Sequence, residues 1–476
     1  MTRRWSRPTL AAATMAALVA AVVPAAAQES QIASDLRRER EHLAESCEPS
    51  PKGVAMCAYS LLTESPLHIA VGSLPPQNGF AFGAAFTEHW TPNESWRLSY
   101  GADAVTALGG SWRAGASLKM IHTPATSGVV VAPPGTRPGT AVIRPREFTV
   151  IDVAWQTISL EQISFYGLGP DTLEADRTVF GEHQSVLGAS VIVPLGQQGG
   201  LTWLRPSLLG GINGRWLDVR PGQDKDGPSL ETRFDDASAP GLARQDRYLE
   251  LREGVRLKPS IANGRVNLNY LLQAQQFRTS AESAGSFHRW TLDLRHEFPI
   301  YRTVTSTGPR DFNGPNECGT SAATPRCPPL ELSRNRTGTA WFRVLRESSI
   351  ASDGDRVPFY FQRTLGGSDL DGQRALAAFA DYRFRGPRLL LLQEGIEHSL
   401  WGPVGVFAQV EHGRVALPGG DLGFGGLKTT TSLGLTIRAG GAPAIVLAFA
   451  WGAEGHHVIA TMDTTLLGGS SRPSLQ

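Results

Sequence analysis

The chain has 476 residues, and its 45 basic and 44 acidic side chains give a formal net charge of +1. This balance excludes the broad basic surface that a nucleic-acid-binding protein presents. Beyond the N-terminus, the longest apolar runs, such as residues 443–451, fall far short of the ~20 residues that a spanning helix needs.

The N-terminus has the features of a secretory signal peptide. Three arginines within the first seven residues precede an apolar stretch at 10–23, which is too short to span a bilayer. Small residues at 25–27 supply a cleavage site, so we expect residues 1–27 to be a signal peptide; a retained anchor is the less favoured alternative. An exported chain of weak hydropathy is either soluble or a β-barrel, because only closed barrels span lipid without long apolar runs.

Residues 28–75 differ from the rest of the chain. A charged, helix-favouring stretch is followed by Cys47 and Cys57, and we expect a short periplasmic helix and a disulfide hairpin. The other two cysteines, Cys318 and Cys327, form a second close pair. Export favours disulfides over metal binding, because neither pair has C-x-x-C spacing or a nearby pair of histidines.

A period of two dominates from residue 79 onward. Phe80, Phe82 and Phe86 share one face of the first segment, and small or polar residues occupy the other. The segments run for about ten or more residues, which suits a tilted membrane strand better than a soluble one. We therefore predict an all-β fold, an antiparallel transmembrane β-barrel of about 16 strands at 76–467, followed by a tail at 468–476.

A soluble β-sandwich would use the same alternation with the opposite geometry, since its apolar face is buried. In a barrel, the apolar face looks toward lipid and the polar face lines the lumen. Aromatic residues at the segment ends, where interfacial girdles fall, favour the barrel. Long polar segments at 122–146, 219–245 and 302–334 are predicted to be extracellular loops, the last braced by the second disulfide.

Two features of the C-terminal third indicate a family. The stretch YFQRTLGGSDLDGQRALAAFADYRF (360–384) places Leu-Gly-Gly before an arginine, and the strands LLLLQEGIEHSLW and VGVFAQVEHGRVA that follow each carry an acid. With FYGLGPDT at 165–172, they resemble the bacterial surface-antigen barrel superfamily. That group includes the outer-membrane barrel-assembly insertase and the two-partner secretion transporters. The resemblance covers most of 75–467 and implies a long loop folded into the lumen.

The resemblance assigns Arg374 as the arginine at the loop tip, Glu397 as the first strand acid and Glu411 as the second. Alternation independently places both acids on the inward face, although the same register turns Glu394 toward lipid. An arginine inside the lumen would meet such carboxylates through charge-assisted hydrogen bonds, so we expect a structural latch. The chain departs from the family at Ala375, where a glycine is expected, and it lacks the repeated periplasmic POTRA modules.

Patterns that carry catalysis or bind metals are weak. The sequence contains neither G-x-S-x-G nor H-E-x-x-H, and the adjacent His456 and His457 would face opposite sides of a strand. We expect no enzyme, no cofactor and no metal.

The predicted function is outer-membrane assembly, protein translocation or passive transport. We expect outer-membrane lipid and envelope or secreted proteins as partners, and no nucleic acid. The alternatives are an enzyme acting on lipids or envelope polymers, and a structural barrel without transport activity.

Overall fold

A computed structural model describes residues 66–123, 147–195, 203–222, 227–262, 264–279, 285–304, 333–351, 355–439, 442–462 and 474–475. The described residues fall within one compact unit, 62–476. The predicted signal peptide, the periplasmic helix and all four cysteines, and with them both predicted disulfides, lie outside the described residues.

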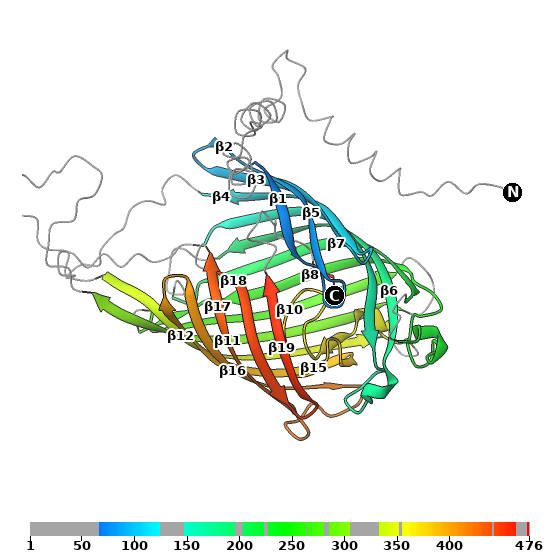
Figure 1. Ribbon diagram of the computed structural model, residues 1–476. Coiled ribbons are helices and arrows are strands. Elements are labelled where there is room, and N and C mark those ends of the chain that lie inside the picture. Colours follow the sequence, from blue (N-terminus) through cyan, green and yellow to red (C-terminus); the bar gives the residue numbers. More distant parts are fainter. Residues whose placement is uncertain are drawn as a thin grey trace, which may run out of the picture. The chain divides into compact units, whose positions relative to one another are not determined.

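Antiparallel strands dominate the described chain. Of the nineteen strands in the described residues, sixteen form a meander in which each pairs with the next, and the remaining three are β9 (Ser260–Ile261), β13 (Arg363–Leu365) and β14 (Phe384–Gly386). The sheet curls into a barrel (Figure 1), so the predicted antiparallel barrel of about sixteen strands is confirmed. The meander consists of β1 (Leu67–Ser73), β2 (Phe80–Asn93), β3 (Trp96–Ala107), β4 (Trp112–His122), β5 (Thr149–Phe165), β6 (Thr178–Pro194), β7 (Pro206–Pro221), β8 (Arg247–Leu257), β10 (Val266–Thr279), β11 (Phe287–Val304), β12 (Ser333–Ala351), β15 (Arg388–Trp401), β16 (Val404–Ala416), β17 (Lys428–Ala439), β18 (Ala442–Gly452) and β19 (Gly455–Met462).

The two faces of the wall differ as the alternation predicts. On β2, Phe80 and Phe82 are 55% and 47% exposed, whereas the intervening Ala81 is 1% exposed. On β17, Leu433 points outward and Ser432 is buried inside. A row of apolar side chains on the outside of the sheet is stable where hydrocarbon covers it, so this is a barrel of the bacterial outer membrane.

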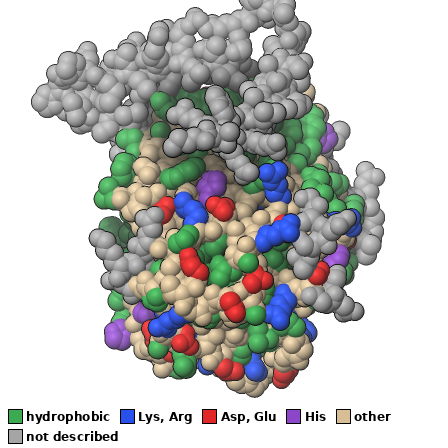
Figure 2. Space-filling view, turned by 90° about the vertical axis from the view of Figure 1, so that its right-hand side faces the viewer, with side chains coloured by type: hydrophobic (Ala, Val, Ile, Leu, Met, Phe, Trp, Pro, Cys, Tyr) green, Lys and Arg blue, Asp and Glu red, His purple; other side chains and the backbone are tan. Residues whose placement is uncertain are grey.

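The described residues contain no helical segment with the length and hydropathy of a membrane span. Acidic and basic side chains lie interspersed on the face drawn in Figure 2.

The wall begins earlier than the sequence indicated. β1 (Leu67–Ser73) pairs along its whole length with β2, from Leu67 opposite Phe86 to Ser73 opposite Phe80. The expected barrel started at residue 76. With only seven residues, β1 is shorter than the membrane strands that the alternation singled out, although its own residues alternate with period two.

Strand order corrects the predicted side of the polar connections. Successive connections of an antiparallel meander alternate between the two ends of the sheet. The segment 122–146 follows the fourth strand, β4, and 302–334 follows the tenth, β11, whereas 219–245 follows the seventh, β7. The first two therefore leave the wall at the end opposite to the third, and the three cannot all be extracellular. Length and polarity, which led to that prediction, favour an extracellular position but do not fix the side, because strand order decides it.

Candidate functional site

One long connection enters the barrel instead of crossing its rim. It joins β12, the eleventh strand of the meander, to β15, the twelfth, and we call residues 355–387 the lumenal segment. It contains a short 3-10 turn, η4 (Phe359–Phe361), and a two-stranded hairpin of β13 and β14. Phe359, Phe361 and Leu376 in it are fully buried. A connection normally stays at the surface, so this burial marks the segment as part of the barrel's interior.

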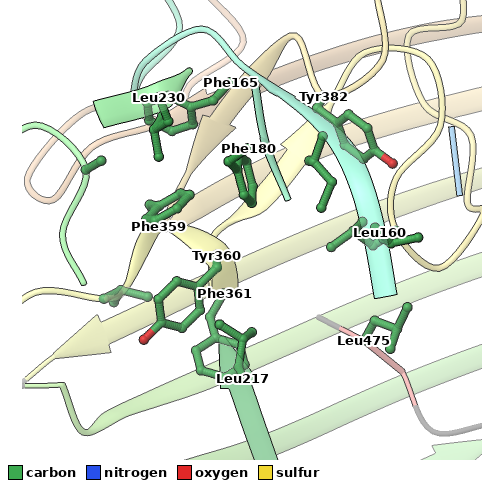
Figure 3. Packing of buried hydrophobic residues seen from close by; sticks show 14 of the residues in the cluster. Leu160, Phe165, Phe180, Leu217, Leu230, Phe359, Tyr360, Phe361, Tyr382 and Leu475 are labelled. Carbon is green, nitrogen blue, oxygen red and sulfur yellow. The ribbon is translucent and has the colours of Figure 1, made fainter. Parts of the chain in front are cut away.

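Aromatic packing holds the start of the segment. The rings of Phe359 and Phe361 belong to one apolar cluster together with inward-facing residues of the wall (Figure 3). Phe359 meets Phe165 and Phe180 edge to face, with ring centroids 5.3 and 5.2 Å apart. The lumen was expected to be lined by small and polar side chains. It is apolar here because the aromatic turn needs an apolar wall to pack against.

Two buried arginines bind the backbone of the same turn. Arg385, on β14, donates from Nη1 to the carbonyl of Phe359 at 2.8 Å, and its guanidinium lies over the rings of Phe165 and Phe180. Arg289, on β11, donates to the carbonyl of Phe361. Both side chains are 1% exposed. Each arginine therefore combines a charge-assisted hydrogen bond with cation–π contact, which fixes the turn against the wall.

Two ion pairs connect the hairpin to different parts of the wall. Arg363 on β13 grips Glu347 on β12 with two contacts, Nε to Oε2 at 2.5 Å and Nη2 to Oε1 at 2.9 Å. Arg383 grips Glu454, in the turn between β18 and β19, with two contacts of 3.0 Å. Arg383 also donates to the carbonyl and hydroxyl oxygens of Thr172. The hairpin is thus tied to distant parts of the wall by bidentate pairs, the geometry that favours arginine over lysine.

The tip of the lumenal segment docks on β15, β16 and β17. The backbone N–H of Ala377 donates to Glu411 Oε2 at 2.9 Å, and the N–H of Ala378 donates to Thr430 Oγ1 at 3.4 Å. Gln393 donates both to Glu411 Oε1, at 2.7 Å, and to the carbonyl of Arg374, at 3.2 Å. Glu411 is completely buried. A wall carboxylate therefore holds the tip through its main chain.

The three residues assigned by resemblance occupy two levels of the lumen. Arg374 lies at the level of Glu411, and burial lowers the pKa of Arg374 while the charges of Glu411 and Asp381 oppose that shift. Glu397 stands four residues beyond Gln393 on β15, about 13 Å farther along the strand. Glu397 accepts a hydrogen bond from Thr436 Oγ1 at 3.0 Å.

Tight main-chain packing explains the Leu-Gly-Gly motif. Gly366 and Gly367 both have positive φ, +107° and +57°. A Cβ added to Gly367 would lie 2.1 Å from Asp381 Oδ1 and 2.8 Å from Asp381 Cα. Only glycine combines that backbone conformation with such a close approach. The motif therefore marks the point where the segment folds back on itself.

The lumenal segment leaves a cavity beside it. A cavity of about 210 Å³ remains between the segment and the wall, lined by polar residues such as Arg252, Gln273 and Asp293 and by Asp369 of the segment. At about 30 Å³ per water molecule, that volume has room for about seven of them. The described residues contain no cluster of histidine, cysteine and acidic side chains suited to a metal ion.

Several anchors were not found from the sequence. Alternation along β12 places Glu347 on the inward face, so its position could be predicted from the sequence. Its partner Arg363 lies in a hairpin that comes close to β12 only in the folded barrel. Arg383 likewise meets Glu454 across 71 positions of sequence. Glu394 lies on the outer face, as the register of β15 requires.

No family model matches the chain, and no curated protein sequence matches it. Solved structures do match. CdiB from Escherichia coli has 11% identity and a TM-score of 0.48 over 84% of this chain and 60% of that one. CdiB from Acinetobacter baumannii has 11% identity and a TM-score of 0.44 over 82% and 56%. BamA from Haemophilus ducreyi lacking POTRA domains 1–3 has 8% identity and a TM-score of 0.44 over 88% and 80%.

The chain thus spans less than two thirds of either CdiB chain. These are barrels of the kind that the C-terminal motifs resemble, and at such identities the likeness concerns the fold alone.

Proposed function

We propose that the chain is an outer-membrane barrel that handles polypeptides, in outer-membrane assembly or in protein translocation. One observation carries the proposal: the lumen is occupied by a segment of the chain itself, held by apolar packing and by polar contacts with the wall. A cavity of about 210 Å³ lies between that segment and the wall. Passive diffusion needs a permanent opening, whereas polar anchors can be exchanged for others when a substrate arrives. No enzymatic activity is proposed.

The proposed partners follow from the outer surface of the barrel and from its lumen. Outer-membrane lipid would contact the apolar exterior, where Phe80 and Leu433 are each 55% exposed. Envelope or secreted proteins would be the substrates. Arg374 would latch the tip of the lumenal segment with Glu411, and Glu397 would supply a second acid deeper along β15. This latch holds the resting position of the segment.

The experiment fixes the lumenal segment to the wall with an engineered disulfide, in the bacterium that carries the gene. Cysteines replacing Ala378 and Thr430, whose main-chain nitrogen and hydroxyl lie 3.4 Å apart, would bond the tip to β17. The single variant Ala378→Cys is the matched control. We would compare the outer-membrane and secreted proteins of a deletion strain complemented with the wild type, the pair or the single variant, with and without reductant.

The proposal predicts that deletion depletes at least one outer-membrane or secreted protein. The wild type and the single variant restore it, and the locked pair restores it only under reduction. Protein profiles that do not change on deletion would refute a role in assembly or translocation.

A further inference from the structure

A second stretch of the chain lies inside the lumen. Ser474 and Leu475, the last two residues described, contact both the lumenal segment and the wall. The hydroxyl of Ser474 donates to Asp371 Oδ2 at 2.6 Å, and the N–H of Leu475 donates to Asp371 Oδ1 at 2.6 Å. Arg215 Nη2 donates to the carbonyl of Ser474 at 2.8 Å, and Gln184 Nε2 donates to that of Leu475 at 3.2 Å.

The side chain of Leu475 is buried as well. It is 5% exposed and belongs to the same apolar cluster as Leu160 and Leu217, which are labelled with it in Figure 3. Leu370, next to Asp371 in the lumenal segment, is a member of that cluster too. Burying the leucine side chain is favourable, so one apolar contact adds to the four hydrogen bonds.

The groups that bind this stretch are held in place by other residues. Arg215 is completely buried and forms an ion pair of 2.7 Å with Glu250, which also accepts hydrogen bonds from Asn213 and Gln275. Asp371 lies 3.7 Å from Arg363. Binding therefore needs little reorganisation of either partner, which is the main requirement for affinity toward a short ligand.

Three of the four hydrogen bonds involve the main chain of the bound stretch. Two side chains of the wall donate to the carbonyls of Ser474 and Leu475. The carboxylate of Asp371 accepts from the hydroxyl of Ser474 and from the N–H of Leu475. Such a site binds the main chain of any peptide that runs in the same direction. It distinguishes side chains at only two positions, where it favours a small hydroxyl residue followed by an aliphatic one. This is the usual division between affinity and specificity in peptide recognition.

We propose that Gln184, Arg215, Asp371 and the neighbouring apolar cluster form a peptide-binding site in the lumen, occupied in cis by Ser474 and Leu475. Its ligand is a peptide with a serine or threonine followed by an aliphatic residue. A tethered occupant competes at an effective concentration in the millimolar range, so an added peptide binds only when the chain's own segment is displaced.

Fluorescence anisotropy tests the proposal with a labelled peptide of sequence SRPSLQ, residues 471–476, and the full-length barrel in detergent. Leu475→Asp puts a carboxylate among apolar groups beside Asp371 and should vacate the site without touching the wall. Leu475→Met keeps an apolar side chain and is the matched control. Asp371→Ala, added to Leu475→Asp, removes two acceptors and leaves Arg363 paired with Glu347. Heat-modifiability on gels shows that each variant is folded.

We expect Leu475→Asp to bind the peptide about 10-fold or more tightly than the wild type and Leu475→Met do. Adding Asp371→Ala should cost about 10-fold or more, as expected for hydrogen bonds to a charged group. A scrambled peptide in which no serine precedes the leucine should bind more weakly, because it loses the contacts by which the site selects. Equal affinity of wild type and Leu475→Asp, or affinity unaffected by Asp371→Ala, would overturn the proposal. The outcome is independent of the proposed function, because binding is measured without assembly or translocation.

Discussion

Arg363 and Glu347 join the lumenal segment to the barrel wall through two contacts, of 2.5 and 2.9 Å. The Glu347 side chain is 3% exposed and that of Arg363 22%. Removing one partner of a buried pair leaves the other charge without compensation, which costs more than the pair itself contributes. The nearby Asp371 offsets part of this cost, at 3.7 Å from Arg363.

We predict that Glu347→Gln destabilises the folded barrel by about 3 kcal/mol. The measurement is unfolding by guanidinium in detergent, followed by the mobility shift on gels. Asp293→Asn is the matched control, because it breaks the Arg343–Asp293 pair between two wall strands, where both side chains are partly exposed. That change should cost about 1 kcal/mol or less. Equal effects of the two substitutions would contradict the assignment of Glu347 as an anchor.

The glycines of the hairpin offer a second matched comparison. Gly367→Ala meets Asp381 at 2.1 Å, whereas Gly372, at φ +74°, has no atom within 4 Å of an added Cβ. Both alanines carry the left-handed backbone penalty of about 1 kcal/mol. We expect only Gly367→Ala to expose the tip to protease, measured by limited proteolysis of the folded barrel. Similar cleavage of both variants would mean that the close approach at Asp381 does not matter.

The predicted latch gives a conductance test. Arg374→Ala removes the guanidinium that lies at the level of Glu411. We expect more frequent openings in planar bilayers and a lower temperature of heat-modification. Arg374→Lys keeps the charge but not the planar guanidinium, and its conductance should fall between that of the wild type and that of Arg374→Ala. If conductance and heat-modification stay unchanged in Arg374→Ala, the latch is wrong.

Asp369 makes the docking of the segment depend on pH. Burial, then the charge of Asp371, raises the pKa of Asp369 to about 7, while Arg363 opposes the shift. An acid with a raised pKa in the folded state contributes stability below its unfolded value, and that contribution is lost as pH rises through about 7. Hydrogen exchange of residues 366–382, corrected for intrinsic rates, should therefore show stronger protection at about pH 5.5 than at about pH 8.5. Asp369→Asn should reduce the difference, and the part that remains comes from Asp381, whose pKa burial also raises.

The sequence predicts the wall far better than what lies within it. Side-chain alternation is local, so the outward positions of Phe80 and Leu433 could be read directly. The side on which 122–146 leaves the barrel depends on the number of preceding strands, and missing the short β1 is enough to change that count. Local alternation also places Glu347 inside. Its pairing with Arg363, and the entry of Leu475 into the lumen, depend on folding between distant segments, which no local pattern encodes.

Spin-label accessibility along β17 tests the central claim most directly. If the barrel lies in lipid and its lumen holds the lumenal segment, labels at Leu433, Leu435 and Ile437 should collide often with oxygen dissolved in the lipid. Labels at Ser432 and Thr436 should be shielded from it, giving a period of two. Uniform accessibility along the strand, or oxygen contact at 432 and 436 with protection at 433, 435 and 437, would contradict the account.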